Sequence, residues 1–127
     1  MIQTLLVFLG GGIGAAGRHG INLAAARLFG TGFPAGTMLV NVTGSFVMGL
    51  AAAWFAFRAS GDLSQHARLF LTTGILGGYT TFSAFSLDAA LLWERGEVFN
   101  AALYVIGSVV LSLLALCAGL ALVRALS

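Results

Sequence analysis

The sequence predicts an all-α integral membrane protein with four transmembrane helices, the third of them broken near its middle. Of the 127 residues, 59% are hydrophobic and only 8% are charged, whereas a soluble domain has about 25% charged residues. So few charges could not cover a soluble surface. Four apolar segments are also long enough to cross a bilayer, which takes about 20 residues. We therefore predict a single four-helix membrane domain over residues 1–127.

The apolar segments give the expected bounds of the helices. They cover Ile2–Phe29, Ala35–Phe57, Ala67–Trp93 and Val98–Val123. The connections between them are short and lie at Gly30–Pro34, Arg58–His66 and Glu94–Glu97. In the second connection, Asp62 and Gln65 have the spacing of a capping box that would open the third helix.

The first segment contains a glycine pattern that has two interpretations. Residues Gly12–Gly17 match G-x-G-x-x-G, but a dinucleotide site also needs an acidic residue about 20 positions on, and the first acid in the chain is Asp62. The pair Gly10 and Gly14 instead has the small-xxx-small spacing of closely packed membrane helices. We therefore favour helix packing. The same spacing recurs at Gly74 with Gly78 and at Ser45 with Gly49.

Arg18 and His19 interrupt the first segment. A charge at the bilayer centre costs roughly 2.5–3.5 kcal/mol on insertion scales. Arg18 is therefore expected either to snorkel to an interface or to attract anions at a pore mouth, and the sequence does not separate these two roles. His19 has no second metal ligand four residues on, so we interpret it as an interfacial residue.

Polar side chains stand out in the second and fourth segments. Asn41 is the strongly polar residue of the second, and a buried amide needs hydrogen-bond partners. It could link helices or line a pore. In the fourth segment, steps of four residues place three hydroxyls on one helix face, which would serve packing or a polar track: Tyr104, Ser108 and Ser112.

The third segment carries the strongest functional signal. Gly77-Gly78 and Thr80-Thr81 lie at its centre, and each glycine weakens a helix by about 1 kcal/mol relative to alanine. Broken backbone is tolerated in a membrane where it faces protein or a water-filled cavity, and transport proteins place ion sites at such breaks. Phe82 and Phe85 follow at helical spacing. They could be core packing, but beside this break we favour a role at an ion site.

Two motifs resemble those of the Fluc (CrcB) family of fluoride channels, and the resemblance covers nearly the whole chain. They are Gly36–Gly44 and Gly77–Ser86. The sequence departs from the family pattern at His19, Ala84 and Asp88, where the family usually has an aromatic residue, Thr or Ser, and Glu. Ala84 changes the polarity beside the phenylalanines.

The resemblance implies a passive, fluoride-selective channel of the cell inner membrane that lets cells expel fluoride, and not an enzyme. It implies an antiparallel, dual-topology homodimer with two pores, in contact with membrane lipid. The residues that it places along the pores are Asn41, Phe82, Phe85, Tyr104, Ser108 and Ser112. It also implies a structural sodium ion, Na⁺, held by the backbone carbonyls of Gly77 and Thr80. Phenylalanine ring edges carry positive partial charge, and hydroxyl and amide groups can donate hydrogen bonds to the anion.

The arginines agree with insertion in both orientations. Four helices put both termini and the second loop on one side, with Arg58, Arg68 and Arg124. The other side has Arg27 and Arg95, with Arg18 assignable to it. The positive-inside bias therefore nearly vanishes.

The alternative function is that of a small multidrug or guanidinium-type exporter, which also has four helices. Proton-coupled exporters of this type need a buried carboxylate in the first helix. This chain has no acid before Asp62, which argues against that function.

Overall fold

The computed structural model is all-helical and describes residues 1–58 and 61–127, apart from the side chain of residue 62. Its elements, in chain order, are α1 (Ile2–Phe29), α2 (Ala35–Phe57), α3 (Asp62–Arg68), the π-helix η1 (Leu69–Leu76), α4 (Gly77–Tyr79), α5 (Phe82–Glu94) and α6 (Val98–Leu126). α3, η1, α4 and α5 together form the third predicted segment. The bounds of α1 and α2 are those predicted from the sequence.

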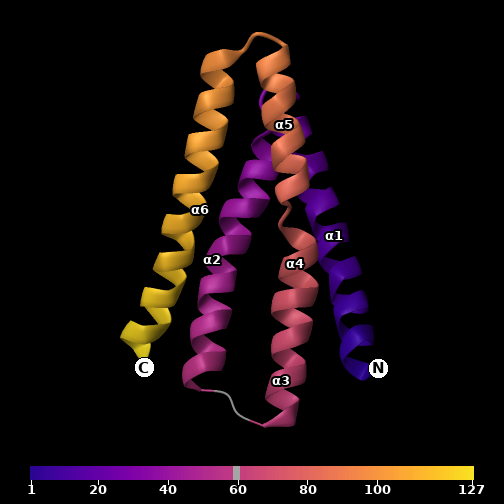
Figure 1. The fold of residues 1–127 in the computed structure, drawn as a ribbon, viewed down its shortest axis with the longest axis vertical. Helices are drawn as coiled ribbons and strands as arrows, with labels where there is room; N and C mark the ends of the chain where they lie inside the picture. The colour runs from indigo at the N-terminus through magenta and orange to yellow at the C-terminus, as the bar shows by residue number, and fades with distance from the viewer. Residues whose placement is uncertain (59–60) are drawn as a thin grey trace.

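The helices run alternately up and down, so that both termini lie at the same end as the connection between α2 and α3 (Figure 1). The other two connections lie at the opposite end. Gly30 and Gly96 have positive φ values of 79° there, a conformation that glycine adopts without steric cost. α2 packs mainly against α6, and α1 packs mainly against η1 and α4.

Three segments are long and apolar enough to cross a membrane: Ala35–Phe57, Leu63–Glu94 and Val98–Leu126. The chain is therefore a multi-pass membrane protein. α1 has 28 residues, which is sufficient length, but it is not among the three. Its polar residues, Arg18 and His19 among them, lower its hydropathy.

The third segment differs from its prediction at its start. Helix begins at Asp62, with Gly61 as the N-cap residue, rather than at Ala67, because the polar run before the apolar segment is itself helical. Asp62 therefore takes the first helical position and not the cap position that a capping box requires, and its side chain lies outside the described residues. The eight-residue π-helix that follows was not predicted.

The predicted break lies at Thr80 and Thr81. Both residues are extended, with φ and ψ of −84° and 157° at Thr80 and −153° and 121° at Thr81. Gly77 and Gly78, which the sequence analysis counted as part of the break, remain helical. The helix therefore ends after the glycines, at the first of the two β-branched residues.

Glycines of α1 and of the third segment let these two segments pack closely, as the small-xxx-small spacing predicted. A Cβ atom on Gly14 would overlap the Ile75 carbonyl oxygen, and one on Gly78 would overlap the carbonyl oxygen of Gly11. At Gly10, a Cβ atom would lie 2.7 Å from the Phe70 carbonyl oxygen. α1 is one continuous helix through this pattern, so the glycines do not form the turn of a dinucleotide-binding loop.

Arginines tie the helix ends together. Arg95 donates to the Gly32 carbonyl at 3.1 Å and pairs with Glu97 at 3.0 Å, which joins the two connections at that end. At the other end, Arg58 donates to the Leu126 carbonyl at 3.0 Å.

Candidate functional site

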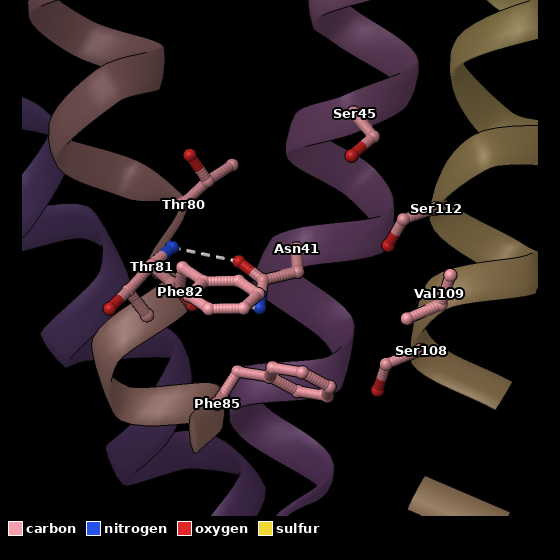
Figure 2. A pocket seen from close by; sticks show the side chains of 9 residues that line it. All are labelled: Asn41, Ser45, Thr80, Thr81, Phe82, Phe85, Ser108, Val109 and Ser112. Carbon is pink, nitrogen blue, oxygen red and sulfur yellow. Dashed lines mark hydrogen bonds between the residues drawn. The ribbon is translucent and has the colours of Figure 1, made fainter. Parts of the chain in front are cut away.

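A shallow, open cavity lies beside the break, between α2, α5 and α6 (Figure 2). Its volume is about 250 Å³, and the residues that line it are Asn41, Ser45, Thr80, Thr81, Phe82, Phe85, Ser108, Val109 and Ser112. Five of the six side chains predicted to line a pore are in this set. None of the lining residues carries a formal charge, but most of them have a hydroxyl or amide group.

Asn41 joins α2 to the break. The Thr81 amide donates to Asn41 Oδ1 at 2.8 Å, and Asn41 Nδ2 donates to the Thr81 carbonyl at 3.1 Å. One side-chain amide thus satisfies both backbone groups of an extended residue. The sequence analysis left two roles open for Asn41, and the structure shows the linking role while also placing the side chain at the cavity wall. Nδ2 carries a second N–H group, which can donate to a ligand.

The restart of the helix is capped by Thr81. Its hydroxyl oxygen accepts a hydrogen bond from the Ala84 amide at 3.1 Å, which is the usual arrangement of a threonine N-cap. This cap fixes the first turn of α5 and hence the directions of Phe82 and Phe85. Sequence reasoning missed this role of Thr81, although a threonine directly before an apolar helical run is the signal for it.

The two phenylalanine rings extend from α5 toward α2 and α6 (Figure 2). Their centroids are 5.6 Å apart and their planes are inclined by 47°. Phe85 is 9% exposed, whereas Phe82 is 78% exposed. Phe85 therefore forms the inner wall of the cavity and Phe82 stands at its open side.

Ser108 and Ser112 form the α6 wall, one helical turn apart, as the stripe of hydroxyls predicted. Ser108 is 4% exposed, and its hydroxyl has no hydrogen-bond partner within the described part of the chain. A buried hydroxyl without a partner costs free energy. This one lies at a cavity wall, where a bound ion or water could accept its hydrogen bond.

Tyr104 does not line the cavity. It is fully buried behind Phe85, with ring centroids 5.2 Å apart, and its hydroxyl donates to Asp88 Oδ2 at 3.2 Å. Its ring also packs edge-on against Phe33 at 5.6 Å. Tyr104 thus packs against Phe85 and lies outside the lining of this cavity, and its role along a pore stays a prediction. The stripe from Tyr104 to Ser112 is about 12 Å long, and the cavity covers its Ser108–Ser112 part.

The carbonyls of Gly77 and Thr80, predicted to bind a cation, have lost their helical partners. In a continuous helix they would accept from the amides four residues on, which belong to Thr81 and Ala84. Those amides donate instead to Asn41 Oδ1 and to Thr81 Oγ1. Thr80 Oγ1 donates back to the Leu76 carbonyl at 2.9 Å. The two side-chain bonds at the break therefore leave both carbonyls available to a ligand.

Two further contacts at the break were not predicted. Tyr79 and Thr43 share a hydrogen bond between their hydroxyl groups at 2.9 Å. Arg18 Nε donates to the Gly78 carbonyl at 3.2 Å, so this arginine lies against the break. His19, on the same helix, is exposed, and among the described residues no three His, Cys, Asp or Glu side chains are grouped as metal ligands.

Comparison with known proteins identifies the family. The family described as "CrcB-like protein, Camphor Resistance (CrcB)" matches residues 5–120. A fluoride-specific ion channel FluC of Rhodopseudomonas palustris strain BisB5 is 66% identical, over 97% of this chain and 98% of its own length. FluC 2 of Nitrobacter hamburgensis, also named a fluoride-specific ion channel, is 65% identical over 99% and 100% of the two chains. The FluC of Methylobacterium nodulans is 60% identical over 98% of both. The motifs, the broken third helix and these matches agree, and the chain belongs to the CrcB-like, or Fluc, family of ion channels.

Proposed function

We propose that this chain is a fluoride-selective passive ion channel that exports fluoride from the cytoplasm and lowers its toxicity. The relatives are named fluoride-specific ion channels, and membership of a channel family makes the chain a channel and not an enzyme. The observation that carries the proposal is the cavity at the break, where a buried hydroxyl, which has no hydrogen-bond partner among the described residues, lies near an aromatic pair.

The chemistry of the cavity suits a small, strongly hydrated anion. Ser108, Ser112 and the free N–H of Asn41 can donate hydrogen bonds that replace water. The ring edges of Phe82 and Phe85 add partial positive charge without a full charge. A site that attracts weakly lets the ion leave as well as enter. Since the lining residues carry no formal charge, the ion is neither repelled nor trapped.

The channel is proposed to be an antiparallel, dual-topology homodimer with two pores. One support is Phe82, which is 78% exposed at the open side of the cavity and which a second copy would cover. The arginines at the helix ends are also nearly balanced, with Arg27 and Arg95 at one end and Arg58, Arg68 and Arg124 at the other. A weak positive-inside bias permits both orientations.

All four helical segments are proposed to span the cell inner membrane, with α1 included. α1 packs along η1 and α4, and its glycines approach their backbones closely. An apolar helix pair in such contact would occupy the same depth of the bilayer. Of the polar side chains of α1 that lower its hydropathy, Arg18 faces protein at the break.

A structural sodium ion is proposed to bind the carbonyls of Gly77 and Thr80. Both carbonyls are freed by the bonds of Asn41 and Thr81, and unpaired carbonyls cost several kcal/mol each in a membrane. A cation would offset that cost. With no cluster of acidic ligands among the described residues, a monovalent cation suits the site better than calcium, which recruits carboxylates.

Fluoride efflux from liposomes tests the proposed function. Purified protein in liposomes loaded with fluoride should release it, as recorded with a fluoride electrode, while liposomes loaded with chloride should retain their anion. Liposomes loaded with guanidinium test the exporter alternative. Guanidinium release driven by a proton gradient, without fluoride release, would replace the channel by an exporter.

A further inference from the structure

The break leaves carbonyl groups at the C-terminal end of α4 without amide partners, which is electrostatically unfavourable. The last carbonyls of a helix lack amide partners and form the negative end of its dipole. In a continuous helix the Gly78 carbonyl would accept from the amide of Phe82, but Phe82 is the first residue of α5. The Gly78 carbonyl therefore needs another donor, inside a segment that is apolar enough to span a membrane.

Arg18 supplies that donor from 60 residues away in the sequence. Its Nε atom is 3.2 Å from the Gly78 carbonyl oxygen, and the contact is partly buried. A cation at a helix C-terminus is favoured by the dipole, and hydrogen bonds from charged groups are stronger than neutral ones. Arg18 thus offsets both the missing partner and the negative end of the helix.

The packing of α1 on α4 sets Arg18 at this position. The two backbones touch at Gly78, where a Cβ atom would overlap the Gly11 carbonyl, and at Gly14, where it would lie 2.7 Å from the Tyr79 amide. A Cβ atom on Gly17 would lie 3.8 Å from the Tyr79 ring. Arg18 directly follows Gly17, the last of these closely packed glycines, so its side chain starts at the end of α4.

We propose that Arg18 is a positioning residue of the channel, which caps the C-terminal end of α4 and so fixes where the third helix breaks. By taking the Gly78 carbonyl, it holds α4 in place while the carbonyls of Gly77 and Thr80 stay free. The expected effect on fluoride flux rests on the proposed function, whereas the capping role rests only on the contact between Arg18 and the Gly78 carbonyl.

Two substitutions whose side chains have similar length distinguish a role of Arg18 as hydrogen-bond donor from a role of its charge. In Arg18→Gln, the side-chain amide nitrogen is as many bonds from the backbone as Arg18 Nε, so a donor is kept and the charge is lost. In Arg18→Met, the side chain has similar length and no donor. Arg18→Lys keeps the charge on a flexible chain without the planar fork. Arg27→Met, in the last turn of α1, removes the same charge away from the break and is the control.

Hydrogen exchange of the Thr80 amide is the first readout. This amide forms the last backbone bond of α4, to the Leu76 carbonyl at 3.0 Å. Arg18→Met should speed its exchange about tenfold or more, as expected for loss of a charged hydrogen bond. Arg18→Gln should stay within about threefold of the original chain, because the donor is kept. An unchanged rate in Arg18→Met, or an equal rise in both variants, would overturn the capping role.

Fluoride efflux is the second readout, and it distinguishes the capping role from an anion-attracting charge. Capping predicts that Arg18→Gln keeps flux within about threefold and that Arg18→Met loses about tenfold or more. Equal losses in both, with full flux in Arg18→Lys, would assign Arg18 to charge attraction instead. If Arg18→Met does not fold, a tenfold faster exchange in Arg18→Gln would overturn the cap and a near-normal rate would support it. If the original chain releases no fluoride, the proposed function fails while the exchange result still decides the role of Arg18.

Discussion

Removal of the Asn41 side chain should destabilise the break directly. In Asn41→Ala, the Thr81 amide loses its acceptor at 2.8 Å, and the Thr81 carbonyl loses its donor at 3.1 Å. Each partly buried group left without a partner costs about 1–3 kcal/mol, so the pair should lower the free energy of unfolding by about 2–6 kcal/mol. The hydrogen bonds are to backbone groups of an extended residue, which cannot find helical partners in exchange.

The measurement is equilibrium unfolding in mixed micelles of a mild detergent and a denaturing one. Ser45→Ala is the control, since Ser45 lines the same cavity on α2 but is not the partner of Thr81. It should change the free energy of unfolding by less than about 0.5 kcal/mol. If Asn41→Ala is as stable as this control, the assigned hydrogen bonds do not hold the break and our reasoning about it is wrong.

Asn41→Asp refines the same test, because it keeps the shape of the side chain. One carboxylate oxygen can still accept from the Thr81 amide, but the other faces the Thr81 carbonyl at the position of the lost donor. It also places a negative charge at the wall of an anion pore. We expect fluoride efflux to be abolished. Normal efflux in this variant would remove Asn41 from the pore wall.

Three further predictions concern the cavity and the close packing of α1 against the third segment. Phe82→Ile and Phe85→Ile keep apolar volume and lose ring-edge charge, so each should reduce fluoride efflux about tenfold or more with the fold intact; unchanged efflux in both would make the rings packing residues. Ser108→Ala removes a buried hydroxyl that has no partner in the described chain, so thermal stability should hold or rise while efflux falls, and a clear loss of stability would contradict this. Gly14→Ala would overlap the Ile75 carbonyl oxygen and should cost about 1–3 kcal/mol or more in unfolding, whereas Gly12→Ala, with no atom within 4 Å, should stabilise α1 by up to about 1 kcal/mol. Equal effects of Gly14→Ala and Gly12→Ala on the free energy of unfolding would refute the close packing at Gly14.

The sequence was sufficient for those features that depend on local pattern. The length of the apolar segments and the turn residues Gly30 and Pro34 between them predicted the bounds of α1 and α2, which agree with the structure. The small-xxx-small spacing predicted the contacts of Gly14 and Gly78. Motif resemblance brought together Asn41 and most of the cavity wall.

The errors arose where a partner distant in sequence decides the outcome. Gly77 and Gly78 were expected to help break the helix, but both remain helical, and α1 packs on Gly78 so closely that a Cβ atom there would overlap the Gly11 carbonyl oxygen. The break falls at Thr80 and Thr81 because Asn41 bonds the Thr81 backbone, which no local pattern reveals. Tyr104 shares a helix face with Ser108, and its bond to Asp88, which the sequence also did not predict, holds it behind Phe85.

The same limit applies to Arg18. The sequence left a choice between an interface and a pore mouth, because a lone arginine in an apolar segment has no local partner to decide it. The Gly78 carbonyl lies 60 residues away and becomes available only because the third helix breaks. Its role thus follows from the break and not from its own surroundings in the sequence.

The most direct test of the central claim is whether fluoride passes through this protein passively. Liposomes loaded with potassium fluoride and containing the purified chain would be diluted into fluoride-free buffer of equal pH, and external fluoride would be recorded with an electrode. A passive channel predicts that net efflux begins when valinomycin lets potassium follow the anion, and that no proton gradient is needed. Absence of efflux after valinomycin, or efflux that requires a proton gradient, would contradict the account.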